Sequence, residues 1–268
     1  LATPRKLILM HKLKIISIAV IVLVLVLFGV YSLQPEQSVI QKIPQSESAK
    51  KPIPDFSQYE ITTEKKKAFF SYLKPAVEAQ NNHILVQREF IHGLRAKYIS
   101  GEMITEKQMQ ELNWLADEYR VDADNKSLEP VFDKLLTRVD IIPVELVLVQ
   151  TANESAWGTS RFARKGYNFF GLWCFKEGCG FVPKRRNDGS VHEVAKFNNL
   201  SRAMYTYMRN LNRHDAYREM RAIRKQLRNK MQPISALALT EGLTKYSERG
   251  DDYVVELKQM IRVNKDLM

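Results

Sequence analysis

The chain has 268 residues, 45% of them hydrophobic, with 41 Lys and Arg against 30 Asp and Glu and only two Cys. This composition is typical of a globular protein and excludes wholesale disorder, while two cysteines are too few for a disulfide-framework mini-protein or a cysteine-rich zinc array. The net charge of +11 indicates an anionic partner, for which nucleic acid, a membrane surface and a cell-wall polymer are the candidates.

The first 33 residues predict a membrane anchor. Because the chain begins with Leu1 rather than Met, we expect an alternative start or a trimmed chain. Residues 15–33 carry no charge and would span about 28 Å as a helix, close to the thickness of a bilayer's hydrocarbon core. Bulky residues at its end favour an uncleaved signal anchor over a cleaved signal peptide, and a buried core helix is a weaker alternative. The preceding flank is basic (Arg5, Lys6, Lys12 and Lys14), so we expect everything after residue 33 to lie across the membrane from the cytoplasm.

A linker and a folded domain follow the predicted anchor. Residues 34–58 are rich in Gln, Ser, Pro and Lys without helical or strand periodicity, which predicts a flexible linker and leaves a folded domain over 59–268. Amphipathic spacing predicts helices over 63–80, 84–100, 105–119 and 127–139. We expect Pro75 to kink or divide the first of them and Gly101 to end the second.

The second half of the domain contains the one strong strand signal. Pro143 opens an apolar run that predicts a buried helix, and residues 178–196 read as strand, turn and strand around Asn187, Asp188 and Gly189. Helices resume at Ser201, Pro233 and Asp251. The predicted fold class is therefore α+β and mostly helical, with a small β-hairpin lobe.

The candidate site lies where the apolar helix turns polar, over residues 149–160. Gly158 is suited to end this helix, and Glu154 and Trp157 are three residues apart, which places them on one helical face. A carboxyl held against an indole loses hydration, which raises its pKa and suits a general acid. The alternative is that Glu154 only caps the helix or forms a salt bridge.

Six segments in order resemble the bacterial glucosaminidase domain of glycoside hydrolase family 73, in the lysozyme-like superfamily, and more closely the Bax-type proteins of Gram-negative bacteria. They are RVDIIP (138–143), ESAWGTSRFA (154–163), WCFKEGCG (173–180), HEVAKF (192–197), NLNRH (210–214) and YSERGDDY (246–253). The resemblance covers residues 65–264, with its motif core over 138–264. It implies a lysozyme-like fold and peptidoglycan as the substrate. Together with the anchor predicted from residues 1–33, we expect a single-pass inner-membrane protein with its catalytic domain in the periplasm.

The resemblance also implies residue roles. Glu154 aligns with the family's catalytic glutamate, the proton donor to the glycosidic oxygen, and Tyr246 with a tyrosine that supports the reacting sugar. Tyr253 matches the second tyrosine of that motif, with a substrate-binding role or plain core packing as the alternatives. The motif departs from the family pattern here, with one additional residue between the tyrosines and no proline.

The second catalytic group is open from sequence. Glycoside cleavage usually needs two carboxylates, and Glu193 is the best candidate, with Asp188 at the turn behind it. Either could instead be a solvated hairpin residue. The substrate's own N-acetyl group could also replace a second acid.

Aromatic side chains and two cysteines complete the predicted site. Sugar rings stack on aromatic faces, so we expect Trp157, Phe170, Trp173 and Tyr253 to bind substrate and Asn168 to fix the loop or the substrate. The natural interpretation of Cys174 and Cys179 outside the cytoplasm is a disulfide. We expect no metal site, because too few further ligands lie at fitting spacing, and no cofactor.

Most of the excess charge lies in residues 201–232, which hold nine basic and two acidic residues. Arg221, Arg224, Lys225 and Arg228 fall at the spacing of one exposed helix face. That face is either simply solvated or attracted to anionic wall polymer or lipid head groups. The rest of the exported chain is neutral, and with no known binding motif we expect no nucleic-acid partner.

The sequence therefore predicts a membrane-anchored periplasmic peptidoglycan hydrolase of the endo-β-N-acetylglucosaminidase type, with Glu154 as general acid. The alternatives are a lytic transglycosylase, a domain of the kind described as an amidase, and a non-catalytic wall-binding module.

Overall fold

The computed structural model describes residues 16–17, 19–26, 38–123, 127–183 and 192–268. The chain divides into two units, Leu1–Val39 and Ile40–Met268, and the second holds the core. In the first unit, residues 16–17 and 19–26 are helical and exposed, and the rest of the predicted anchor lies outside the described residues. No helix among the described residues is both long and apolar enough to cross a membrane.

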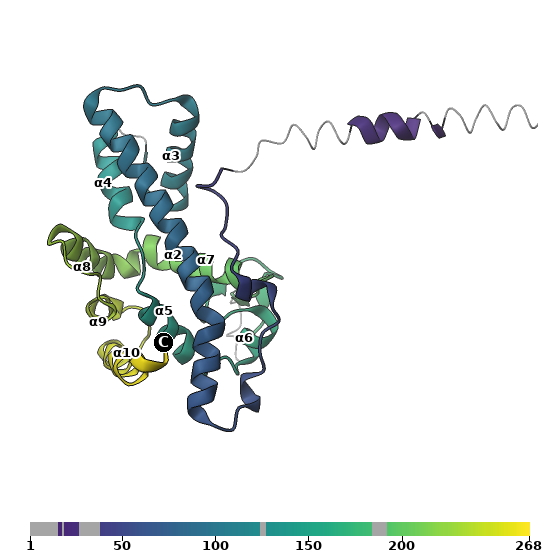
Figure 1. Cartoon of the computed structure of the whole chain (residues 1–268), viewed down its shortest axis with the longest axis vertical. Helices are drawn as coiled ribbons and strands as arrows, with labels where there is room; N and C mark the ends of the chain where they lie inside the picture. Colours follow the sequence, from purple (N-terminus) through teal and green to yellow (C-terminus); the bar gives the residue numbers. More distant parts are fainter. Residues whose placement is uncertain (1–15, 18, 27–37, 124–126, 184–191) are drawn as a thin grey trace, which may run out of the picture. The chain divides into compact units, whose positions relative to one another are not determined.

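The second unit is built on one long helix, α2 (Thr62–Ser100), which packs against α4, α5 and α7 (Figure 1). The sequence predicted two helices here, but Pro75 lies inside a continuous helix. Gly101 ends α2 in the left-handed conformation, as expected (φ 75°). Two shorter helices follow, α3 (Glu106–Glu118) and α4 (Glu129–Arg138). Thr105 and Gln108 cap α3 reciprocally, which explains why that helix starts where predicted.

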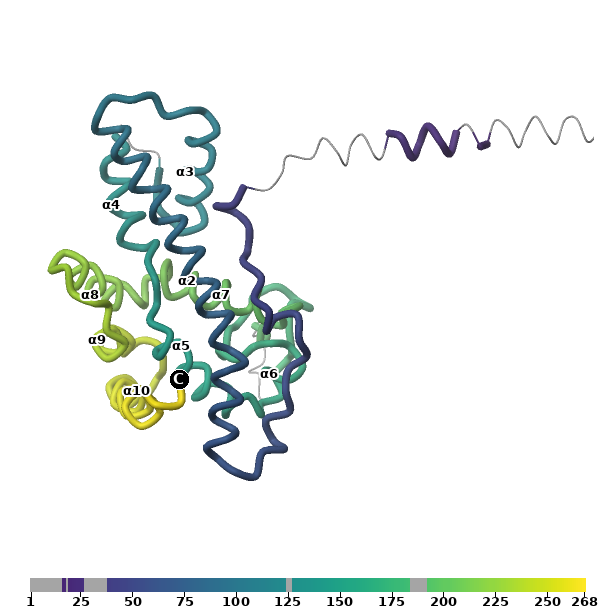
Figure 2. The backbone as a smooth tube through the Cα atoms, in the orientation of Figure 1, coloured from purple at the N-terminus to yellow at the C-terminus, as the bar shows by residue number. Residues whose placement is uncertain are grey.

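The predicted linker is packed against the domain from Ile40 onward, which corrects the expectation of a flexible segment over 34–58. Figure 2 shows this segment running alongside α2, with two short turns at Glu47–Lys50 (η1) and Phe56–Gln58 (η2). The Phe56 side chain is fully buried, and Gln87 of α2 donates a hydrogen bond to the Ile40 carbonyl at 2.8 Å. Apolar side chains widely spaced along a Pro-rich stretch have no periodicity, so their burial leaves no pattern in the sequence.

Helix α5 (Val144–Glu154) crosses the centre of this unit, in contact with α2, α9 and α10. The remaining helices and turns are α6 (Arg161–Gly166), α7 (Leu200–Arg213), η3 (Asp215–Tyr217), α8 (Arg218–Asn229), α9 (Ala236–Thr240), η4 (Glu241–Leu243), α10 (Asp251–Asn264) and η5 (Lys265–Leu267). The mostly helical α+β class is as predicted, and the middle of α5, residues 146–152, is buried.

The β lobe is a sheet of three short strands in the order β1-β3-β2. They are β1 (Trp173–Cys174), β2 (Gly180–Phe181) and β3 (Glu193–Ala195), and both pairings are antiparallel, with Trp173 and Phe181 opposite Val194. The sequence predicted only the pairing of β2 with β3. The turn expected at 187–189, with Asp188, lies outside the described residues.

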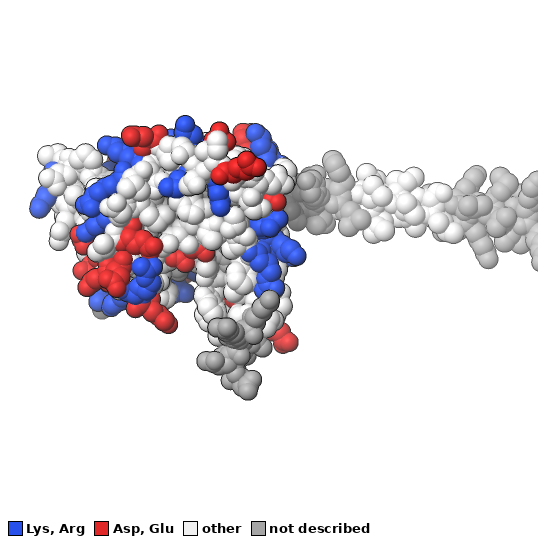
Figure 3. All heavy atoms as spheres, turned by 90° about the horizontal axis from the view of Figure 1, so that it is seen from below, with Lys and Arg blue, Asp and Glu red and all other residues white. Residues whose placement is uncertain are grey.

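The predicted basic face of α8 is wrong, because two of its four cations point inward. Arg221 and Arg224 are buried, and Arg228 pairs with the buried Asp140 at 2.8 Å, which leaves Lys225 as the exposed, unpaired member among the described residues. On the face that Figure 3 shows, basic side chains lie among acidic ones. The four cations do share one side of the helix, but the part of it that carries Arg221 and Arg224 packs against the core.

Candidate functional site

Glu154 is the last residue of α5, and a sharp turn follows it. Ala156, Trp157 and Gly158 all have positive φ angles (50°, 57° and 77°), and the Trp157 amide donates to the Ala152 carbonyl at 2.8 Å. Gly158 is needed here, because a Cβ on it would lie 2.4 Å from the ring of Phe56. The helix therefore ends four residues earlier than predicted, at the carboxylate itself.

This ending displaces Trp157 from the predicted site. Its indole packs edge-on against Phe69 and Phe70, with ring centroids 5.6 and 5.3 Å apart, and it does not line the cleft that holds Glu154. The expectations of an indole packed against the Glu154 carboxyl and of substrate binding by Trp157 are both wrong, because three residues of left-handed backbone do not continue a helical face.

The Glu154 side chain lines a cleft of about 630 Å³ between the helices and the sheet. This volume is that of a ligand site. Aromatic residues line much of the cleft, and the wall formed by α7 and its neighbours is polar and basic. The lining residues are Arg120, Glu154, Phe170, Gly171, Leu172, Trp173, Cys174, Phe175, Ala195, Phe197, Thr206, Arg209, Asn210, Arg213, His214, Tyr217 and Tyr246.

The half-buried Glu154 carboxyl has a raised pKa. Burial is the main cause, because it disfavours the charged form, and the negative charge of Glu256 adds to it. The Tyr253 hydroxyl opposes the shift by donating a hydrogen bond to Oε1 at 3.0 Å, and the charge of Arg249 opposes it weakly. A carboxyl in this setting holds its proton closer to neutral pH, as a general acid requires.

A buried chain of hydrogen bonds fixes the position of Tyr253. Its hydroxyl accepts from the Gln150 amide at 3.2 Å, and the Gln150 carbonyl accepts from the Tyr207 hydroxyl at 2.6 Å. Sequence reasoning missed Gln150 and Tyr207. A polar residue four positions before Glu154 in an otherwise apolar helix was the available indication, since positions i and i+4 share a face.

Tyr253 is 1% exposed and does not line the cleft, so its predicted place among the substrate-binding residues is wrong. Burial and the charge of Glu154 raise its pKa, which keeps the hydroxyl protonated as a donor. Its ring stacks parallel to that of Tyr246, 5.5 Å away. Tyr246 does line the cleft, and its hydroxyl donates to the Phe170 carbonyl at 3.1 Å.

Asn168 is buried and folds the loop that faces Glu154. Its amide donates to the carbonyls of Leu172 and Ala195 at 2.8 and 2.9 Å, and its carbonyl accepts from the amides of Phe170 and Leu172. Of the two roles predicted for Asn168, the structure supports loop fixation. The loop brings Gly171 so near that a Cβ there would lie 3.5 Å from Glu154 Oε2.

Two of the four aromatic residues predicted to bind substrate line the cleft, Phe170 and Trp173. Phe170 is buried and stacks on Tyr207 with ring centroids 4.2 Å apart, so it supports the wall. Trp173 is 51% exposed and has His192 tilted against its ring at 4.1 Å, which leaves indole surface open to a ligand. Phe175 lies beyond it and is still more exposed.

Glu193 is 4% exposed, and both of its carboxylate oxygens accept backbone amides, from Gly178 at 2.9 Å and Gly180 at 2.7 Å. It does not line the cleft. The structure therefore does not bring Glu193 to Glu154 as a second acid but uses it to fold the loop between β1 and β2.

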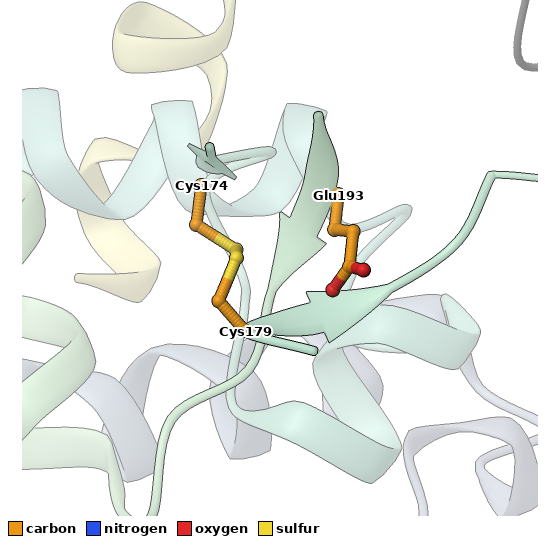
Figure 4. A group of neighbouring side chains, drawn as sticks. All are labelled: Cys174, Cys179 and Glu193. Atoms are coloured by element: carbon orange, nitrogen blue, oxygen red, sulfur yellow. A yellow bond between two sulfur atoms is a disulfide. The ribbon is translucent and has the colours of Figure 1, made fainter. Parts of the chain in front are cut away.

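The same loop carries the disulfide expected between Cys174 and Cys179 (Figure 4). These two sulfurs and the Glu193 carboxylate form the one group of potential metal ligands that lie close together among the described residues. The two sulfurs are bonded to each other, and the carboxylate accepts hydrogen bonds from two backbone amides, so all three groups already have bonding partners within the protein.

Comparison with known proteins places this site in a family. Residues 129–266 match the family model described as mannosyl-glycoprotein endo-beta-N-acetylglucosaminidase, named Glucosaminidase. The chain belongs to the glucosaminidase family. It is also 33% identical over 216 residues to the protein bax of Escherichia coli K12, which covers 81% of this chain and 76% of that protein. No solved structure matches.

The glucosaminidase match covers the elements that build the cleft, from α4 to α10. Membership supports a peptidoglycan-related glycosidase, and the similarity to bax confirms the predicted Bax-type protein with a glucosaminidase domain.

Proposed function

We propose that this protein is an endo-β-N-acetylglucosaminidase that hydrolyses the glycan strands of peptidoglycan, with Glu154 as the general acid. The observation that supports this most directly is the Glu154 carboxyl, which faces a cleft of about 630 Å³ with a pKa raised by burial. Exposed aromatic surface at Trp173 and Phe175 offers stacking faces for sugar rings.

In the proposed reaction, Glu154 donates its proton to the glycosidic oxygen while the bond from that oxygen to the anomeric carbon breaks. Among the described residues that line the cleft, Glu154 is the only acid. This favours the alternative in which the N-acetyl group of the substrate attacks the anomeric carbon, after which water completes the hydrolysis. Tyr253 and Gln150 hold the acid in place.

A single acid also fits a lytic transglycosylase, in which a sugar hydroxyl takes the place of water. The two reactions leave different chain ends, and mass spectrometry of digested peptidoglycan separates them. We expect products with a reducing N-acetylglucosamine end. Anhydro-muramic ends would show a transglycosylase instead, and no release by the wild-type protein would favour the non-catalytic wall-binding module.

We further propose that the domain works outside the cytoplasm. The disulfide between Cys174 and Cys179 supports this, because structural disulfides persist in oxidising compartments. The expected outcome is that both cysteines of a tagged full-length chain are oxidised in the cell, as measured by thiol labelling.

A further inference from the structure

The cleft that holds Glu154 is also lined by arginines. Arg120, Arg209 and Arg213 all border it, together with His214. They are not the counter-ions of Glu154, because the charges that shift the pKa of Glu154 are those of Glu256 and Arg249. The wall formed by the end of α3 and by α7 therefore carries a positive charge of its own.

One acid, Glu118, faces this group. Its carboxylate accepts hydrogen bonds from the Arg209 guanidinium and the Tyr205 hydroxyl, and its backbone carbonyl accepts from Arg213 at 3.0 Å. Burial by itself would raise the pKa of Glu118, but these partners lower it, so the carboxylate is ionised near neutral pH.

One carboxylate does not balance three guanidinium groups. Burial and the charges of Arg209 and Arg120 lower the pKa of Arg213, which shows that the like charges act on one another. Arginine nonetheless stays charged near neutral pH. Arg120 is exposed, and among the described residues its guanidinium forms no ion pair. About two positive charges therefore face the cleft without a carboxylate to balance them among the described residues.

Guanidinium groups bind carboxylates in a planar, two-pronged geometry, and such charge-assisted bonds are stronger than neutral ones. A chain of N-acetylated sugars has no charge of its own. Carboxylates enter peptidoglycan through its peptide branches, or through the lactyl ether groups that carry those branches once the peptides are removed. The positive wall thus matches a feature of the substrate that the acid Glu154 does not recognise.

We propose that Arg120 and Arg213 bind a carboxylate of the substrate strand and so set the specificity of the cleft for carboxylate-bearing glycan. This rests on the proposed function, since it takes the peptidoglycan strand as the ligand. Arg209, already paired with Glu118, holds the wall together.

Binding tests this directly. The full-length protein carrying Glu154→Gln, to prevent cleavage, is titrated calorimetrically with three soluble strands: peptide-bearing strands, strands freed of peptide with lactyl carboxylates, and the latter with those carboxyls converted to amides. We expect Arg120→Gln to weaken binding of a carboxylate-bearing strand about tenfold, the loss of one charge-assisted hydrogen bond, and to leave the neutral strand unchanged.

Matched variants sharpen the comparison. Arg120→Lys should restore part of the affinity. Arg213→Gln should repeat the selective loss, and an unchanged thermal melting temperature of that variant is the control for its folding. Arg262→Gln, an exposed arginine outside the cleft, should have no effect. Loss on the peptide-bearing strand locates the carboxylate in the peptides, and loss only on the peptide-free strand locates it in the lactyl group.

Equal weakening on all three strands, or none, would overturn the inference. The proposed function fails separately, when the wild-type protein releases no product from peptidoglycan. Because the binding assay needs no cleavage, the two failures are distinguishable.

Discussion

At the scale of single residues, the groups around the Glu154 carboxyl shift its pKa in opposite directions. Burial and the charge of Glu256 raise the pKa of Glu154, whereas the hydrogen bond from Tyr253 lowers it. The protonated form that donates to a leaving oxygen is lost as the pH rises through this pKa, so activity should fall on the basic side.

Two substitutions should move that basic limb in opposite directions. Tyr253→Phe removes a hydrogen bond that favours the ionised form, so the pKa of Glu154 rises further and the limb shifts to higher pH. Glu256→Gln removes a negative charge, so the limb shifts to lower pH. The measurement is the pH dependence of kcat/KM, with the exposed Glu248→Gln as the control. A limb that stays in place in both variants would contradict this account of the site.

The sequence pointed to Glu154 but not to the groups that shift its pKa. Glu154, Tyr246, Phe170 and Trp173 do meet in one cleft. The prediction for Trp157 is wrong because α5 ends at Glu154 and the backbone turns left-handed over residues 156–158. Such a turn leaves little trace in the sequence except one glycine. The prediction of Glu193 as a second acid is wrong for another reason. A carboxylate that accepts hydrogen bonds from backbone amides and one that reacts look alike in a sequence.

At the scale of elements, a buried arginine holds the segment that leads into α5. Arg224 of α8 is 1% exposed and donates to the carbonyls of Thr137 and Arg138, at the end of α4, and of Asp140 and Ile141 beyond it. Carbonyls at a helix end have no partners within the helix, so this side chain supplies them. Arg224 thereby fixes the RVDIIP segment as far as Ile141, two residues before Pro143, which is the N-cap of α5, and the other end of α5 carries Glu154.

Arg224→Met should lower the free energy of unfolding by about 3 kcal/mol, because it leaves those buried carbonyls unpaired and removes a charge that faces Asp140. Urea denaturation measures this. Lys225→Met, an exposed cation next to it, should change the free energy of unfolding by less than about 0.5 kcal/mol. Equal effects of the two substitutions would show that Arg224 does not anchor this segment.

At the scale of the whole molecule, the net charge of +11 is divided among several structural roles. In the segment 201–232, Arg221 and Arg224 are buried, Arg228 pairs with Asp140, and Arg209 and Arg213 line the cleft. Composition located this charge in the chain. Whether the basic side chains point to the core, the cleft or the solvent depends on which face of α8 meets α4 and η4. Packing between segments far apart in sequence sets that face.

The central claim, that Glu154 protonates the leaving oxygen, is tested most directly by changing the leaving group. A 2,4-dinitrophenyl β-glycoside of an N-acetylglucosamine oligomer needs no proton to depart, whereas the natural glycan does. Glu154→Gln should lose about 10²–10⁴-fold in kcat/KM on glycan strands but stay within about tenfold of the wild-type protein on the dinitrophenyl substrate. An equal loss on both substrates, or unchanged cleavage of the glycan, would contradict the assignment.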